Sequence, residues 1–141
     1  MSADLRERIV REAMRWLGTP HHHRAAVLGA GVDCGQLMVQ VFSAVGIIEP
    51  FDTGEYPPDW HLHRSEERYL GFVQRHAREV DRPERGDLVV IRFGRCFSHG
   101  GILLNARELV HAYVGRGVCV GELEEFRERE KRFFTVVGHG G

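Results

Sequence analysis

Apolar residues recur at helical spacing in three stretches of the first eighty residues, which predicts three amphipathic helices. The first covers residues 2 to 17, with an apolar face and arginines mostly opposite. The second begins at Asp33 and Cys34 and ends at Gly46, because glycine favours the left-handed stop of a helix. The third follows Ser65 as its N-cap and carries an apolar stripe formed by Tyr69, Leu70, Val73, Ala77 and Val80.

From Pro83 onward the apolar pattern changes to the short runs typical of β-strands. The runs predict five strands, at residues 88–91, 102–104, 109–113, 118–120 and 133–137. Helices therefore precede strands, which favours an α+β fold with the helices against one face of an antiparallel sheet. No repeat, linker or low-complexity tract interrupts the chain, so residues 1–141 are expected to form a single domain.

Composition narrows the classes of partner. The 141 residues include 19 Lys and Arg against 20 Asp and Glu, for a net charge of −1. This balance offers no broad field for polyanions, so we expect no nucleic-acid partner and no membrane partner. Charged residues interrupt the first 17 positions, which resemble neither a secretory signal nor a membrane span. Three scattered cysteines are too few for a disulfide framework and are expected to be reduced.

Cys34 is the first candidate for chemistry. With Asp33 as N-cap, Cys34 falls in the first turn of the second helix, where unpaired backbone N–H groups and the helix dipole favour a thiolate. This position makes Cys34 a candidate nucleophile. The alternative is a small buried residue that caps a core helix, because a free cysteine packs well as a hydrophobic group.

A cysteine nucleophile needs a base, and the base needs a group that orients it. His99 precedes two glycines, and His111 lies twelve positions further along, in the next predicted strand. If Leu104 pairs with Glu108, His111 faces Gly101 and lies diagonal to His99 on the same face. Alternatively, His99 is a surface residue at a strand end, and His111 is a hydrogen-bonded core histidine.

Five short motifs follow one another along the chain: Gly18-Thr19-Pro20, Gly31-Val32-Asp33-Cys34, Arg85-Gly86-Asp87-Leu88-Val89, Ser98-His99-Gly100-Gly101-Ile102 and Val110-His111-Ala112. Together they resemble the NlpC family of papain-like cysteine peptidases. The resemblance implies Cys34 as nucleophile, His99 as its base and His111 as the residue that orients the base. It also implies a papain-like NlpC fold, with helices on a five- to six-stranded antiparallel sheet, and no cofactor or metal.

The resemblance further implies a substrate. The family cleaves peptidoglycan stem peptides between γ-D-glutamate and a diamino acid, with His21, Asp33, Gly35, Ser98 and Gly100 here at the substrate-binding positions. Two of these depart from the family pattern: Gly35 replaces a serine and His21 replaces a tyrosine. An imidazole donates hydrogen bonds as a phenol does, but its charge changes near neutral pH.

Residues 54–69 resemble the phage-tail branch of the family. Together with the N-terminal pattern, this implies an enzyme that associates with phage tail proteins in the virion, or lies in the host cytoplasm before assembly.

Two alternatives remain open at the level of sequence. Cys96 and His99 have a two-residue ligand spacing, and further histidines at positions 21–23, 61 and 63 make a zinc site conceivable. The second alternative is a tail-assembly or plug module that keeps the fold while its site is catalytically silent.

Overall fold

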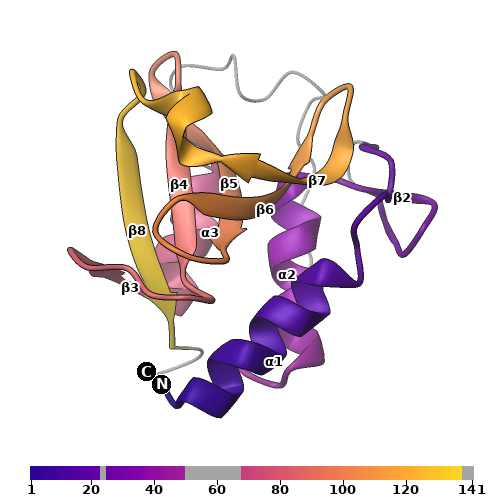
Figure 1. Cartoon of the computed structure of the whole chain (residues 1–141), viewed down its shortest axis with the longest axis horizontal. Helices are drawn as coiled ribbons and strands as arrows, with labels where there is room; N and C mark the ends of the chain where they lie inside the picture. The colour runs from indigo at the N-terminus through magenta and orange to yellow at the C-terminus, as the bar shows by residue number, and fades with distance from the viewer. Residues whose placement is uncertain (23–24, 50–67, 138–141) are drawn as a thin grey trace.

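The computed structural model describes residues 1–22, 25–49 and 68–137. Within this part, three α-helices and a short 3-10 helix accompany a six-stranded antiparallel sheet with the order β3-β8-β4-β5-β6-β7 (Figure 1). A two-stranded sheet, β1 (Ala26–Val27) and β2 (Gly31–Val32), leads into the second helix. The α+β class and the antiparallel sheet that the sequence predicts are confirmed. No helix in the described ranges is long and apolar enough to cross a membrane.

The first two helices both begin after a side-chain cap, and the cap of the second, Asp33, is the predicted one. Helix α1 (Ala3–Met14) follows Ser2, whose hydroxyl accepts a hydrogen bond from the Leu5 N–H at 3.1 Å. Helix α2 (Cys34–Ala44) follows Asp33, whose carboxylate accepts from the Gln36 N–H at 2.9 Å. Helix α1 ends three residues before the predicted Leu17, and residues 15–18 form turns instead.

The third helix is shorter than predicted. Helix α3 (Arg68–His76) ends four residues before Val80, and Ala77–Val80 form the edge strand β3. The prediction was wrong because the apolar residues Ala77 and Val80 also suit a strand. In β3 they pair with Val136 and Phe133 of β8, whose backbone would otherwise form an open sheet edge. The expected N-cap of this helix, Ser65, lies outside the described residues.

The remaining strands occur where the sequence places them, but several extend further. They are β4 (Leu88–Phe93), β5 (Cys96–Leu103), β6 (Glu108–Tyr113), β7 (Gly117–Glu122) and β8 (Lys131–Val136). Strand β5 begins six residues before the predicted start, because it pairs with β4 beyond Ile91 through a bulge. His99 therefore lies inside the strand rather than before it.

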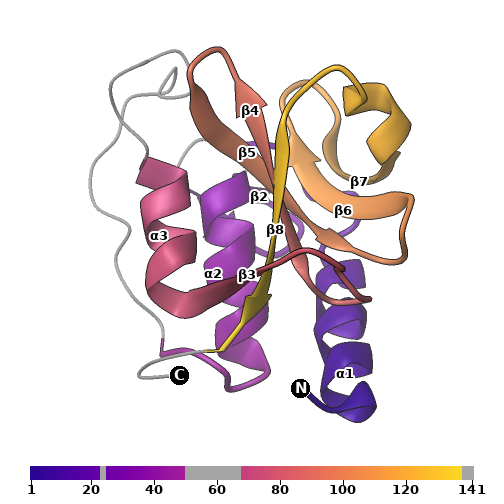
Figure 2. The same ribbon diagram turned by 90° about the vertical axis from the view of Figure 1, so that its left-hand side faces the viewer.

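The sheet separates two apolar clusters, because alternate residues of each strand point to opposite faces. The larger cluster lies between the sheet and the helices, and it includes Leu88, Val90 and Ile102. The smaller one contains Val89, Ile91 and the buried Phe126 of the 3-10 helix η2 (Leu123–Phe126). Figure 2 shows α2 and α3 together on one side of the sheet and η2 on the other.

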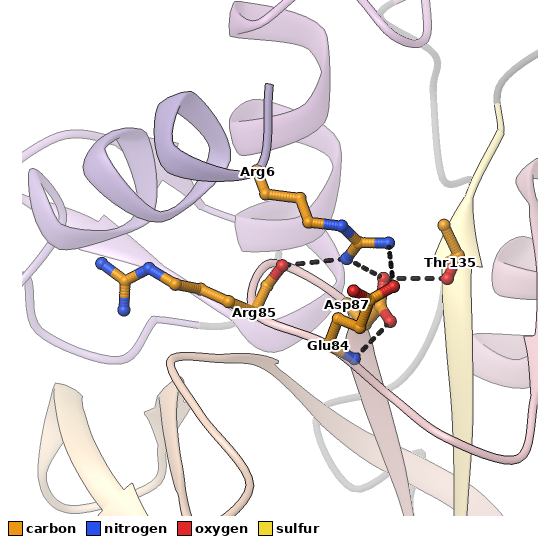
Figure 3. Close-up of polar contacts among 5 residues, drawn as sticks. All are labelled: Arg6, Glu84, Arg85, Asp87 and Thr135. Atoms are coloured by element: carbon orange, nitrogen blue, oxygen red, sulfur yellow. Dashed lines mark hydrogen bonds and ion pairs between the residues drawn. The ribbon is translucent and has the colours of Figure 1, made fainter. Parts of the chain in front are cut away.

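A buried carboxylate joins α1 to the sheet (Figure 3). Asp87 is 1 % exposed, and one of its oxygens accepts hydrogen bonds from the Arg6 guanidinium at 2.8 Å and the Thr135 hydroxyl at 2.9 Å. Its other oxygen accepts from the Glu84 N–H at 2.8 Å. The preceding Gly86 has φ +88°, a conformation that L side chains rarely adopt. The Arg85-Gly86-Asp87 motif therefore fixes α1 against β4 and β8.

Candidate active site

Helix α2 directs its first residue at the middle of β5. Cys34 is buried, and its thiol donates to the carbonyl oxygen of Ser98, with 3.7 Å between sulfur and oxygen. The backbone N–H of Gly100 also interacts with the thiol. Since Ser98 and Gly100 flank His99, the sulfur lies against the backbone on both sides of that residue.

Burial determines the protonation state of Cys34 in the free protein. Desolvation raises the pKa of the thiol well above its ordinary value, and the charge of Asp33 raises it further. The backbone N–H groups of Gly100, Gly35 and Cys34 act in the opposite direction. The helix start therefore favours the thiolate, as the sequence suggests, but burial outweighs it. The free protein holds a neutral thiol.

The two candidate histidines meet across the β5–β6 hairpin. His99 Nε2 lies 2.8 Å from His111 Nδ1, a hydrogen bond between two buried rings. The register has Ile102 opposite Val110 and Leu103 opposite Leu109, which continues the predicted pairing of Leu104 with Glu108. The prediction that both rings share a face is confirmed.

Gly101 makes this approach possible. A Cβ at Gly101 would lie 2.7 Å from the Val110 carbonyl oxygen and 3.1 Å from the His111 Cβ. The glycine that follows His99 and Gly100 therefore provides space for the neighbouring strand and its histidine.

Aromatic side chains surround the histidine pair on the face of the sheet that η2 covers. The His99 ring lies 5.5 Å from Phe93 and 6.0 Å from Phe126, and His111 stacks on Tyr113 at 5.2 Å. His111 is completely buried, and this desolvation lowers its pKa to about 4. His111 is therefore neutral at pH 7.

The predicted substrate-binding residues lie around the start of α2 and along β5. His21 forms a one-residue bridge with Val32, next to Asp33. Asp33 and Gly35 are buried at the helix start, where the carboxylate of Asp33 serves as the cap. Ser98 is buried, and its hydroxyl has no hydrogen-bond partner within the described ranges. Their contact with substrate stays a prediction.

Sequence reasoning missed Tyr69. This residue belongs to the apolar stripe of α3, but its hydroxyl occupies the place where a Cβ of Gly100 would lie. Burial raises the pKa of Tyr69, and the negative charge of Asp33 adds to the effect, so the phenol stays protonated beside the site. The signal in the sequence was Gly100, since a glycine inside a strand indicates a close approach.

The zinc alternative involves residues that the structure separates or does not describe. Cys96 is fully buried at the start of β5, and His99 pairs with His111. In residues 1–22, 25–49 and 68–137, no three His, Cys, Asp or Glu side chains are grouped so that they could hold a metal ion. Residues 23, 61 and 63 lie outside these ranges.

Comparison with known proteins identifies the class. The profile of the NlpC/P60 family matches residues 13–136, and the chain belongs to this family. A probable endopeptidase NlpC homolog from Haemophilus influenzae is 31% identical over 113 residues. This match covers 78% of the present chain but only 50% of the relative, so the chain spans half the length of that protein.

Solved structures share the fold. The NlpC/p60 domain of the peptidoglycan hydrolase SagA superposes with a TM-score of 0.60 at 21% identity, covering 90% of this chain and 96% of that domain. A lipoprotein-like member of the NLP/P60 family from Staphylococcus aureus superposes with a TM-score of 0.66 at 18% identity. This second match covers 99% of the present chain and 43% of the other.

Proposed function

We propose that this protein is a cysteine peptidase that hydrolyses amide bonds in peptidoglycan stem peptides. The observation that carries the proposal is the placement of the Cys34 thiol against the backbone on both sides of His99, whose ring is hydrogen-bonded to His111. Membership of the NlpC/P60 family and the peptidoglycan hydrolase among the structural neighbours support the substrate class.

In the proposed reaction, His99 Nδ1 takes the proton of the Cys34 thiol while its Nε2–H donates to His111 Nδ1. The thiolate attacks the amide carbon, and the carbonyl oxygen becomes an oxyanion near the backbone N–H of Cys34 at the start of α2. His99 returns the proton to the leaving amine. Water, deprotonated by His99, then hydrolyses the thioester and restores the thiol.

Because the thiol is neutral in the free protein, the proton transfer to His99 would accompany substrate binding rather than precede it. The thiolate–imidazolium pair then forms next to the bond to be cleaved. This order keeps a reactive thiolate out of the free enzyme.

The bond between γ-D-glutamate and a diamino acid is the proposed point of cleavage, on the strength of the family motifs around Cys34, His99 and His111. Association with phage tail proteins is a further proposal that rests on the resemblance of residues 54–69 to the phage-tail branch. Residues 54–67 lie outside the described ranges.

The buried, neutral Cys34 favours a second candidate, the catalytically silent tail-assembly or plug module. Incubation of the protein with purified disaccharide-tetrapeptide muropeptides, followed by mass spectrometry of the products, distinguishes the peptidase from the silent module. We expect the wild type to release a diamino acid–D-alanine dipeptide, and Cys34→Ala to reduce the rate by at least about 10³-fold. Ser43→Ala is the control, since Ser43 lies near the other end of α2 and its hydroxyl makes no hydrogen bond within the described residues, so this variant should keep full activity.

An unchanged rate in Cys34→Ala would contradict the assignment of the nucleophile. A wild type that cleaves neither lysine- nor diaminopimelate-containing muropeptides would favour the silent module.

A further inference from the structure

The ring of His111 is enclosed by residues that come from three separate elements. Tyr113 of β6 stacks on it, with 5.2 Å between ring centroids and 18° between planes. Phe126 of η2 meets it at right angles with 5.9 Å between centroids, and the same side chain lies 6.0 Å from His99. Phe126 is 4 % exposed, although Glu124 and Glu125 directly precede it in a polar segment of the chain.

Gly121 of β7 bounds the remaining edge of the ring. A Cβ at this position would lie 2.5 Å from His111 Nε2, closer than real Cβ atoms approach their neighbours. The backbone of β7 therefore fits the imidazole only because position 121 has no side chain. At the opposite edge of the ring, Nδ1 is directed at His99.

We propose that Phe126 and Gly121 are positioning residues of the active site, which together with Tyr113 form a socket that holds the His111 ring with Nδ1 toward His99. The inference rests on the proposed function, in which His111 orients the base. It assigns a role to the charged segment after β7: η2 carries the phenylalanine that packs against both histidine rings.

The socket determines what His111 can do. A neutral imidazole has one donor and one acceptor nitrogen, so Nδ1 accepts from His99 Nε2–H only while His111 is uncharged. The groups facing His111 are His99, Tyr113, Cys119 on the paired strand, and the ion pair of Arg116 with Glu125 at 3.0 Å. Arg116 and Glu125 act on His111 with opposite sign, and burial in the socket has the largest effect on its pKa.

In this orientation the proton of His111 resides on Nε2. Within the described part of the chain this atom is buried without a hydrogen-bond partner. Hydrogen bonding therefore does not hold this end of the ring, and the packing of Phe126, Tyr113 and Gly121 is what keeps it in place.

The test compares Phe126→Ala with Phe126→Leu. Each protein is prepared with isotopically labelled histidine, and the pKa of His111 is measured by an NMR pH titration. We expect a pKa near 4 in the wild type, a shift toward 6.5 in Phe126→Ala as water reaches the ring, and a value close to wild type in Phe126→Leu. Leu123→Ala is the matched control, because Leu123 also belongs to η2 and packs against the same cluster. It should leave the His111 pKa unchanged.

Activity provides the second readout. In Phe126→Ala the acid limb of kcat/KM should move up by at least ~1 pH unit, with KM little changed, and Phe126→Leu should restore the wild-type profile. A His111 pKa that stays near 4 in Phe126→Ala, or that shifts equally in Leu123→Ala, would overturn the proposal.

Gly121→Ala tests the side of the socket that the backbone of β7 forms. It also covers the case in which Phe126→Ala does not fold. Its methyl group should displace the ring and change the Nδ1 chemical shift of His111, and an unchanged spectrum would count against the socket. The NMR readouts are independent of catalysis. If the wild type cleaves no muropeptide while Phe126→Ala shifts the pKa, the proposed function fails and the socket remains.

Discussion

His99 and His111 form a hydrogen bond across the β5–β6 hairpin, with 2.8 Å between Nε2 of the first and Nδ1 of the second. The pair depends on strand register, because each ring has to point to the same face from a different strand. A one-residue slip would turn His111 toward the helices and leave His99 without a partner.

The first prediction concerns the acceptor at position 111. His111→Asn places an amide oxygen near the position of Nδ1 and should keep kcat/KM within about tenfold of wild type. His111→Leu fills the space but accepts no hydrogen bond, and should lower kcat by about 10²-fold or more, with KM little affected. Steady-state kinetics on a muropeptide substrate would measure both. Equal activity in the two variants would show that orientation of His99 does not need an acceptor.

The second prediction is an acid-dependent loss of stability. The pKa of His111 falls from 6.5 to about 4 on folding, so the unfolded chain binds more protons between these values. Stability from this group is therefore complete above pH 6.5 and is lost as the pH falls toward 4, by about 3 kcal/mol in total. Urea unfolding from pH 7.5 to 4 should show this slope in the wild type and a smaller one in His111→Leu. Parallel curves for the two proteins would contradict a buried neutral His111.

The third prediction concerns the resting thiol. Because burial raises the pKa of Cys34, alkylation by iodoacetamide at pH 8.5 should be at least about tenfold slower in the folded protein than in guanidinium. Asp33→Asn keeps a good N-cap but removes the second cause of the shift, and should speed alkylation. Mass spectrometry of the Cys34 peptide gives the rates. Rapid labelling of the folded wild type would mean that the free protein already holds a thiolate.

The fourth prediction concerns the buried carboxylate beneath α1. Asp87→Ala leaves the Arg6 guanidinium, whose side chain is 11% exposed, without its main partner and should cost about 3 to 5 kcal/mol of stability. Glu7→Ala removes the exposed ion pair with Arg85 and should cost less than about 1 kcal/mol. Thermal or urea unfolding measures both losses of stability. Similar losses would show that the buried contacts of Asp87 stabilise the fold no more than the exposed ion pair of Glu7 does.

Local sequence determined the features that depend on a few neighbouring residues. Ser2 and Asp33 mark the beginnings of α1 and α2, because each supplies a side-chain acceptor to an unpaired helical N–H. The shared face of His99 and His111 followed from counting, since side chains alternate along strands and the turn fixed the register. The fold class followed from the order of helical and strand periods.

Only the tertiary structure decided the features that depend on distant residues. Residues 77–80 become a strand because β8 offers them a partner, and β8 itself lies between β3 and β4 although it is last in the chain. Phe126 contacts both histidine rings because the chain folds η2 back over this face of the sheet. The helix start alone suggested a thiolate at Cys34, but packing against β5 removes water from the sulfur. Desolvation is a property of everything that surrounds an atom, so no local pattern around Cys34 could specify its charge.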